Sequence, residues 1–193
     1  MAKLQVTLEG IAKARPSIKG WEPEMERRFL VEAFPFRTDD FPGTRSSYPH
    51  LPIVQFYVKN DGAEYDKFRL RRIGNSFFAS VKRGKGLFRE EKKWEILEYE
   101  FRALMRGVEW PRVKKTRYYL EWEGENIELD VFHRHNGSNL KGLVIAEVEF
   151  SSLRRAEMFE VPEWFGTEIT WKKGYGNGSF AKRGMPDAIR LLR

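Results

Sequence analysis

The sequence of 193 residues contains no cysteine and only three histidines, His50, His133 and His135. The absence of cysteine excludes disulfides, zinc–thiolate sites and cysteine nucleophiles, and three scattered histidines are too few for a histidine-rich metal site. There is no run of about 18 apolar residues, so we expect no membrane-spanning helix. The N-terminal segment lacks the continuous apolar stretch of a signal peptide. These absences predict a cytoplasmic protein without a membrane partner.

Charge and aromatic residues are abundant instead. Lysine and arginine number 35 against 28 aspartates and glutamates, a net charge of +7, and aromatic residues make up 15% of the chain. The aromatic content is too high for a disordered chain, and the basic excess indicates an anionic partner such as phosphate or nucleic acid. The length suits one domain with an appendage. We assign residues 1–22 to an N-terminal extension and 23–193 to the domain.

Alternating apolar and charged residues predict mostly β-strands. The expected strands are 24–31, 53–58, 68–71, 77–82, 89–95, 112–122, 126–132 and 143–150. Helical spacing is found in three further segments, 96–106, 152–159 and 179–192. The proline-rich segment 35–52 reads as a long loop. The pattern predicts an α+β fold with a mostly antiparallel sheet or barrel.

One face of nearly every expected strand is charged, because residues two apart in a strand point the same way. These rows are Glu24, Glu26 and Arg28; Arg69 and Arg71; Arg89, Glu91, Lys93 and Glu95; Lys115 and Arg117; Glu128 and Asp130; and Glu147 and Glu149. A half-solvated sheet explains any single row. Repetition across six strands favours a closed barrel with the charges inside. Carboxylates there would hold hard divalent cations and basic groups would hold phosphate oxygens, so a metal–polyphosphate ligand fits both signs.

Seven segments, in this order, carry a resemblance to a known family. They are Glu24-Met25-Glu26-Arg27-Arg28, Arg69-Leu70-Arg71, Val81-Lys82-Arg83-Gly84, Lys115-Thr116-Arg117-Tyr118, Glu128-Leu129-Asp130-Val131-Phe132, 143–150, and Glu163 to Asn177. The sequence resembles the triphosphate tunnel metalloenzymes, also called the CYTH superfamily, over about residues 22–186. No single motif is specific, but the ordered series is.

The resemblance implies an eight-stranded antiparallel β-barrel, a tunnel with flanking helices, that binds a triphosphate-containing small molecule with Mg²⁺ or Mn²⁺. By position, the metal ligands would be Glu24, Glu26, Glu147 and Glu149. The catalytic residues would be Glu24, Glu26 and Arg28. The substrate-binding residues would be Arg69, Arg71, Lys82, Arg89, Lys115 and Arg117. We do not expect nucleic acid as a partner, and a second copy of the chain is a further candidate partner.

The chain departs from the family pattern at several positions. Arg28 replaces the usual lysine, and arginine and lysine are not interchangeable at a tight phosphate site. Lys93 stands where many bacterial members carry glutamate. Lys172 and Gly174 stand where aspartate and arginine are common. Replacing two acids by lysine either reduces metal binding at one site or adapts the tunnel to a more anionic or larger ligand.

Three functions remain open on this basis. The leading hypothesis is metal-dependent hydrolysis of inorganic triphosphate or a nucleoside triphosphate. An adenylyl cyclase of the same fold ranks lower, because no separate sequence element selects an adenine ring. A non-catalytic binder of polyphosphate or nucleotides is the third, motivated by Lys93 and Lys172.

Overall fold

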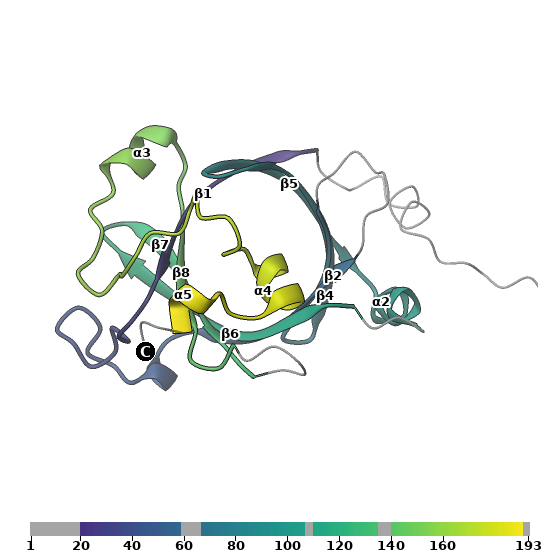
Figure 1. Ribbon diagram of the computed structural model, residues 1–193, viewed down its shortest axis with the longest axis horizontal. Coiled ribbons are helices and arrows are strands. Elements are labelled where there is room, and N and C mark those ends of the chain that lie inside the picture. The colour runs from purple at the N-terminus through teal and green to yellow at the C-terminus, as the bar shows by residue number, and fades with distance from the viewer. Residues whose placement is uncertain (1–19, 59–66, 107–109, 135–139, 191–193) are drawn as a thin grey trace, which may run out of the picture.

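The eight strands close into one antiparallel barrel. A computed structural model describes residues 20–58, 67–106, 110–134 and 140–190. The strands are β1 (Glu22–Leu30), β2 (His50–Val58), β3 (Lys67–Ile73), β4 (Ser76–Lys85), β5 (Phe88–Ile96), β6 (Arg112–Trp122), β7 (Glu125–Phe132) and β8 (Val144–Glu149). They follow each other around the barrel in the order β1-β5-β4-β3-β2-β6-β7-β8, and Figure 1 shows this ring of strands. The α+β barrel predicted from the sequence is confirmed.

The alternation seen in the sequence decides which face of each strand is covered. Leu129, Ala146 and Val148 belong to the apolar rows and are fully buried on the outer face. Because successive side chains of a strand point to opposite faces, the charged rows then point into the barrel. Burying the outer rows under helices and loops removes apolar surface from water, which is the main favourable contribution to folding. The sequence pattern therefore places the main apolar core on the outer face of the barrel, under helices and loops, and charged residues on much of its inner face.

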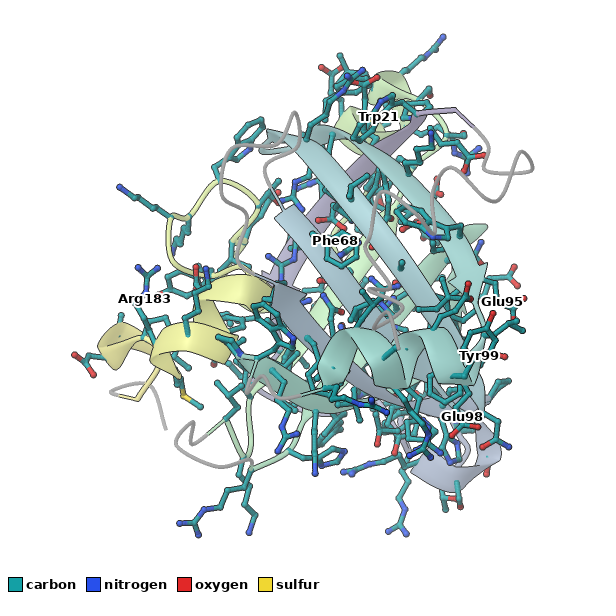
Figure 2. All side chains as sticks on the ribbon, turned by 90° about the vertical axis from the view of Figure 1, so that its right-hand side faces the viewer. Trp21, Phe68, Glu95, Glu98, Tyr99 and Arg183 are labelled. Carbon is teal, nitrogen blue, oxygen red and sulfur yellow. The ribbon has the colours of Figure 1, made fainter. Side chains whose placement is uncertain are left out.

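Helices lie both outside the ring of strands and within it (Figure 1). They are the 3₁₀ turn η1 (Arg45–Ser47), α2 (Glu98–Met105), α3 (Leu153–Met158), α4 (Asn177–Arg183) and α5 (Asp187–Arg190). Figure 2 shows α2 lying across the outer face that carries Phe68, where Phe101 of α2 joins the same apolar cluster. The hydroxyl of Ser152 accepts a hydrogen bond from the Arg155 amide at 3.3 Å and so caps the start of α3.

Two expectations need correction. The loop expected over 35–52 is shorter, because β2 begins at His50, and it is packed, because Phe41 is buried in the core formed with β6 to β8. The C-terminal helix expected over 179–192, with an interruption at Gly184 and Pro186, is indeed divided there into two short helices, but the first of them begins earlier, at Asn177. Gly184 has φ of 76° and ends α4, and a proline cannot continue the helical hydrogen bonds.

The described residues include only part of the predicted N-terminal extension. β1 begins at Glu22, opposite Glu91 of β5, whereas residues 1–19 lie outside the described residues. The division into an extension of 1–22 and a domain of 23–193 therefore stays a prediction. Across the described ranges, no helix combines the length and the hydropathy that crossing a bilayer would require.

Candidate active site

The inward faces of the strands enclose a polar cavity of about 180 Å³. The residues that line it are Glu24, Glu26, Arg28, Gln55, Tyr57, Arg69, Arg71, Lys82, Arg89, Glu91, Lys93, Lys115, Arg117, Glu128, Glu147, Glu149 and, from α4 and the residue before it, Gly176, Asn177 and Gly178. Eight of these are basic and six are acidic. The lining therefore carries an excess of positive charge and is suited to an anion.

Two basic residues of the lining, Lys115 and Arg117, form ion pairs with the buried Asp130, and we call these three residues the paired cluster. Arg117 donates from Nε and Nη2 to the two oxygens of Asp130, both at 2.7 Å, and Lys115 donates to Asp130 as well. All three side chains are less than 10% exposed. Burial alone would lower the pKa of Arg117, but Asp130 and Glu147 raise it above its ordinary value. Burial and the neighbouring Arg117 lower the pKa of Lys115 to about 8.

Arg28 is held in the cavity wall from two sides. Its Nε donates to Glu147 at 2.9 Å, and its Nη1 donates to the carbonyl oxygen of Tyr175 at 3.1 Å. Glu147 also accepts from Arg117 Nη2 at 2.7 Å. The second terminal nitrogen of Arg28, Nη2, is buried and has no hydrogen-bond partner. A buried guanidinium N–H without a partner is costly, so this group is poised to bind an anion in the cavity.

A second chain of ion pairs runs along β3, β4, β5 and β1. Lys82 donates to Glu24 and lies 3.5 Å from Glu91, which in turn accepts from Arg69. Burial opposes ionisation of Glu91, but Arg69 and Lys82 outweigh it and lower its pKa to about 2. Each phosphate-binding candidate here therefore has a carboxylate partner that a ligand must share or displace.

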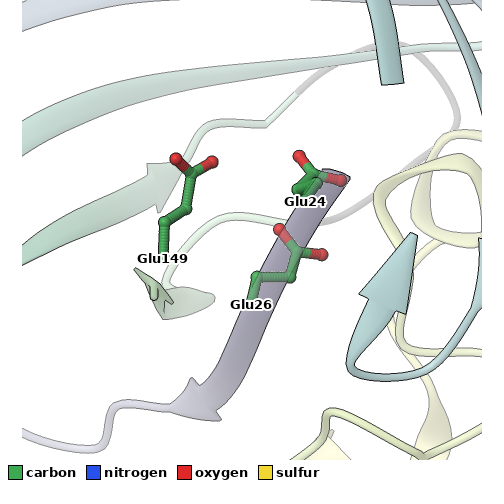
Figure 3. A group of neighbouring side chains, drawn as sticks. All are labelled: Glu24, Glu26 and Glu149. Carbon is green, nitrogen blue, oxygen red and sulfur yellow. The ribbon is translucent and has the colours of Figure 1, made fainter. Parts of the chain in front are cut away.

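Three carboxylates gather at one place, and we call them the acid group: Glu24, Glu26 and Glu149. Each offers an oxygen within 4.8 Å of the others, and Figure 3 shows the three side chains converging from β1 and β8. Burial, followed by Glu26, raises the pKa of Glu149. Burial also raises the pKa of Glu24, against the effect of Lys82. Oxygen ligands converging in this way are the donors that hard divalent cations prefer.

Two proteins of known name are similar in sequence to this chain. A protein of Nitrosomonas europaea named inorganic triphosphatase is 36% identical over 159 residues, which are 82% of this chain and 96% of that protein. A second protein of that name, from Acetivibrio thermocellus, is 32% identical and covers 82% and 93%. The chain belongs to the triphosphate tunnel metalloenzymes. A crystal structure of an inorganic triphosphatase resembles the barrel with a TM-score of 0.57 at 34% identity, over 82% of this chain and 93% of that one. No family model matches the sequence.

All the site residues expected from the family resemblance line the tunnel. Glu24, Glu26, Arg28, Arg69, Arg71, Lys82, Arg89, Lys115, Arg117, Glu147 and Glu149 face the same cavity. Their roles stay predictions. The structure separates Glu147 from the acid group, because Glu147 is taken up by Arg28 and Arg117. Lys93 lines the cavity, whereas Lys172 does not and lies 5.9 Å from the ring of Tyr175.

Some residues of the tunnel were missed. Glu91, Glu128 and Asp130 stood in the charged rows of the sequence but were assigned no part in the site, although each binds a basic residue of the tunnel. The two-residue spacing was the signal that could have included them. Tyr57 and Asn177 are neutral, so the two-residue spacing of charged side chains could not assign them to the tunnel lining.

A second cavity, of about 260 Å³, lies beside the end of β1 and the start of β8. Most of its lining is apolar or backbone, with Glu32 as its one charged side chain, so it is not suited to a polyphosphate. Although it is larger, the charged tunnel is the better candidate, because chemistry on phosphate needs groups that compensate its charge.

Proposed function

We propose that this chain hydrolyses a triphosphate bound in the tunnel, with inorganic triphosphate as the first candidate and a nucleoside triphosphate as the second. The observation that carries the proposal is a closed barrel lined by eight basic side chains, with the buried N–H groups of Arg28 Nη2 and Arg71 Nε unpartnered. An anion rich in acceptor oxygens would satisfy them. Both named relatives are inorganic triphosphatases, which supports this order of candidates.

The basic side chains supply binding and electrostatic stabilisation. Arg28, Arg69 and Arg117 present flat forks of donors that match phosphate oxygens, and ion pairs with carboxylates hold them in place. Phosphoryl transfer requires mainly that the reacting groups be held in line and that charge on the oxygens be neutralised. A preorganised tunnel of this kind provides both, because its groups are oriented before the ligand enters.

The acid group fits a divalent cation. Its three carboxylates converge, and burial, followed by the neighbouring carboxylates, raises the pKa values of Glu24 and Glu149. We propose that Glu24, Glu26 and Glu149 hold Mg²⁺ or Mn²⁺. Such an ion supplies a Lewis acid that neutralises phosphate oxygens and lowers the pKa of water. Glu147 as a fourth ligand stays a prediction, and in its observed position it orients Arg28.

A substrate panel tests the proposal. The purified chain is incubated with tripolyphosphate or ATP and with Mg²⁺ or Mn²⁺, and phosphate, pyrophosphate and cyclic AMP are measured together. We expect metal-dependent release of phosphate from tripolyphosphate, and its loss in Glu24→Gln. Cyclic AMP with pyrophosphate from ATP would point to the cyclase instead. Tight tripolyphosphate binding without turnover would point to the non-catalytic binder.

Two further expectations from the sequence concern the setting of the protein. A cytoplasmic location and a homodimer both stay predictions. Light scattering of the purified chain measures the second directly, and a monomer at all concentrations would contradict it.

A further inference from the structure

Two cations of the tunnel differ from the rest. Arg71 and Lys93 line the cavity, yet neither makes an ion pair within the described ranges, whereas the other six basic residues of the lining each bind a carboxylate. The Nε atom of Arg71 is buried without a hydrogen-bond partner. Burial and the neighbouring Arg69 and Arg117 lower the pKa of Arg71 to about 10. A buried cation that is left uncompensated needs an anion to offset its lost hydration.

The strand register places Lys93 one inward position away from Arg71, because Lys93 is level with Arg69 and Glu95 is level with Arg71. On β4, Ser80 lies opposite both Arg69 and Lys93, and Phe78 lies opposite Arg71. The Nζ atom of Lys93 lies 5.8 Å from the centre of the Phe78 ring. Lys93 therefore leans from β5 over the intervening strand, toward the level of Arg71 on β3. The Lys93 side chain is exposed, so it is accessible to a ligand in the tunnel mouth.

The order of strands sets Arg71 apart from the acid group, whereas Lys93 stands on β5, which pairs directly with β1. The acid group stands on β1 and β8, which are neighbours, and β3 is separated from β1 by β5 and β4. Arg71 thus stands on a different wall of the barrel. A linear triphosphate with one end at the acid group would direct its other end toward Arg71, the level toward which Lys93 leans.

The chemistry of that other end differs between the two candidate substrates. A terminal phosphoryl group carries about two negative charges near neutral pH and has three free oxygens. In a nucleoside triphosphate, the corresponding phosphate is esterified, so it has one charge fewer and one free oxygen fewer. Two unpaired cations compensate the terminal group better than the esterified one.

We propose that Arg71 and Lys93 form the subsite for an unesterified terminal phosphoryl group, and that Lys93 selects inorganic triphosphate over nucleoside triphosphates. This inference rests on the proposed triphosphatase activity. It assigns to Lys93 a contact with substrate, at a position where the family resemblance led us to expect an acid.

The test compares two substrates in matched variants. The ratio of kcat/KM for tripolyphosphate to that for ATP is measured at constant ionic strength for the wild-type chain, Lys93→Gln and Lys92→Gln. Lys92 is the control, because it carries the same charge on the opposite face of β5, paired with Val81 of the outer cluster. We expect Lys93→Gln to lower kcat/KM for tripolyphosphate by about ten- to a hundredfold, the range for one hydrogen bond between charged groups. For ATP we expect a change of less than about twofold.

Binding without turnover provides a second readout. Calorimetric titration with tripolyphosphate in the presence of a chelator should show the same loss of affinity in Lys93→Gln but not in Lys92→Gln. Equal effects on both substrates, no effect, or an equal effect of Lys92→Gln would overturn the subsite. A wild-type chain that hydrolyses no triphosphate would refute the proposed function instead, so the two failures are distinguishable.

Discussion

The paired cluster and the acid group occupy the same tunnel but hold their charges in opposite ways. In the paired cluster, Asp130 is completely buried and is bound by both Lys115 and Arg117. In the acid group, three carboxylates stand within 4.8 Å of each other, and the pKa values of Glu24 and Glu149 are raised. Lys82 binds Glu24 and Arg89 binds Glu26, but Glu149 makes no ion pair among the described residues. The paired cluster therefore compensates its charges internally, whereas the acid group keeps a carboxylate whose repulsion a bound cation would relieve.

The largest effect is expected from breaking the paired cluster. Asp130→Asn removes the charge that neutralises Lys115 and Arg117 and leaves buried cations undercompensated. We expect the free energy of unfolding, measured in urea, to fall by about 3–5 kcal/mol. Glu90→Gln is the control, because it breaks the exposed pair with Arg83 and should change the free energy of unfolding far less than Asp130→Asn. A similar small loss for Asp130→Asn would contradict a structural role for the cluster.

The acid group should respond more in activity than in stability. Glu26→Gln keeps the shape of the side chain and removes one of three mutually repelling charges. We expect kcat/KM for tripolyphosphate to fall by about 100-fold or more, since metal binding is weakened. Because Glu26 also accepts from Arg89 at 2.7 Å, the free energy of unfolding should fall as well, but by less than for Asp130→Asn, since Arg89 is more exposed than Lys115 and Arg117. Calorimetry with Mn²⁺ alone should show the weakened metal binding directly. Unchanged Mn²⁺ affinity would argue against Glu26 as a ligand.

The pH dependence of stability tests whether the ion pairs of Glu91 also hold the barrel together. The pKa of Glu91 lies at about 2 in the folded chain, below the ordinary value of 4.5, despite the opposing effect of burial, because Arg69 and Lys82 favour its charged form. A lowered carboxyl pKa stabilises the fold above pH 4.5, and this contribution disappears as the pH falls toward 2. Glu91→Gln should therefore reduce stability by roughly 2 kcal/mol at pH 7, by about half as much near pH 3, and by little only once the pH is at or below about 2. A difference from wild type that does not shrink with acid would contradict this account.

The smallest effect is expected at Arg71. Because Arg71 has a lowered pKa and a buried Nε without a partner, its charge is a cost to the folded chain. Arg71→Gln should leave the free energy of unfolding unchanged or raise it by about 1 kcal/mol, while weakening tripolyphosphate binding. Thermal unfolding and calorimetry measure the two quantities. A clear loss of stability would show that Arg71 belongs with the paired cluster instead.

Much of the fold could be predicted because it depends on local patterns. Alternation located all eight strands, and the Glu123-Gly124 turn between β6 and β7 has the positive φ values, 50° and 78°, that tight hairpins require. The boundaries of β2 and of the C-terminal helices were less accurate. Phe41 and Phe180 explain why, because their burial against distant strands stabilises segments whose own sequence gives little signal.

The candidate site was predictable in membership but not in its pairing. Glu147 and Glu149 share one strand face and one motif, so the sequence alone makes them equivalent. Register separates them: Glu147 lies opposite Arg28 on β1, whereas Glu149 lies opposite Glu26. One carboxylate therefore gains a guanidinium, and the other gains a second negative charge.

The sequence by itself determined that charged and apolar residues occupy opposite faces of the strands, and that no cysteine is available for a thiolate site. These are consequences of composition and of the two-residue period of a strand. The closure of the barrel decided that the charged face would be enclosed, and the register decided which charges would meet. Both arise from contacts between segments far apart in the chain, and a local pattern does not encode the partner against which it will lie.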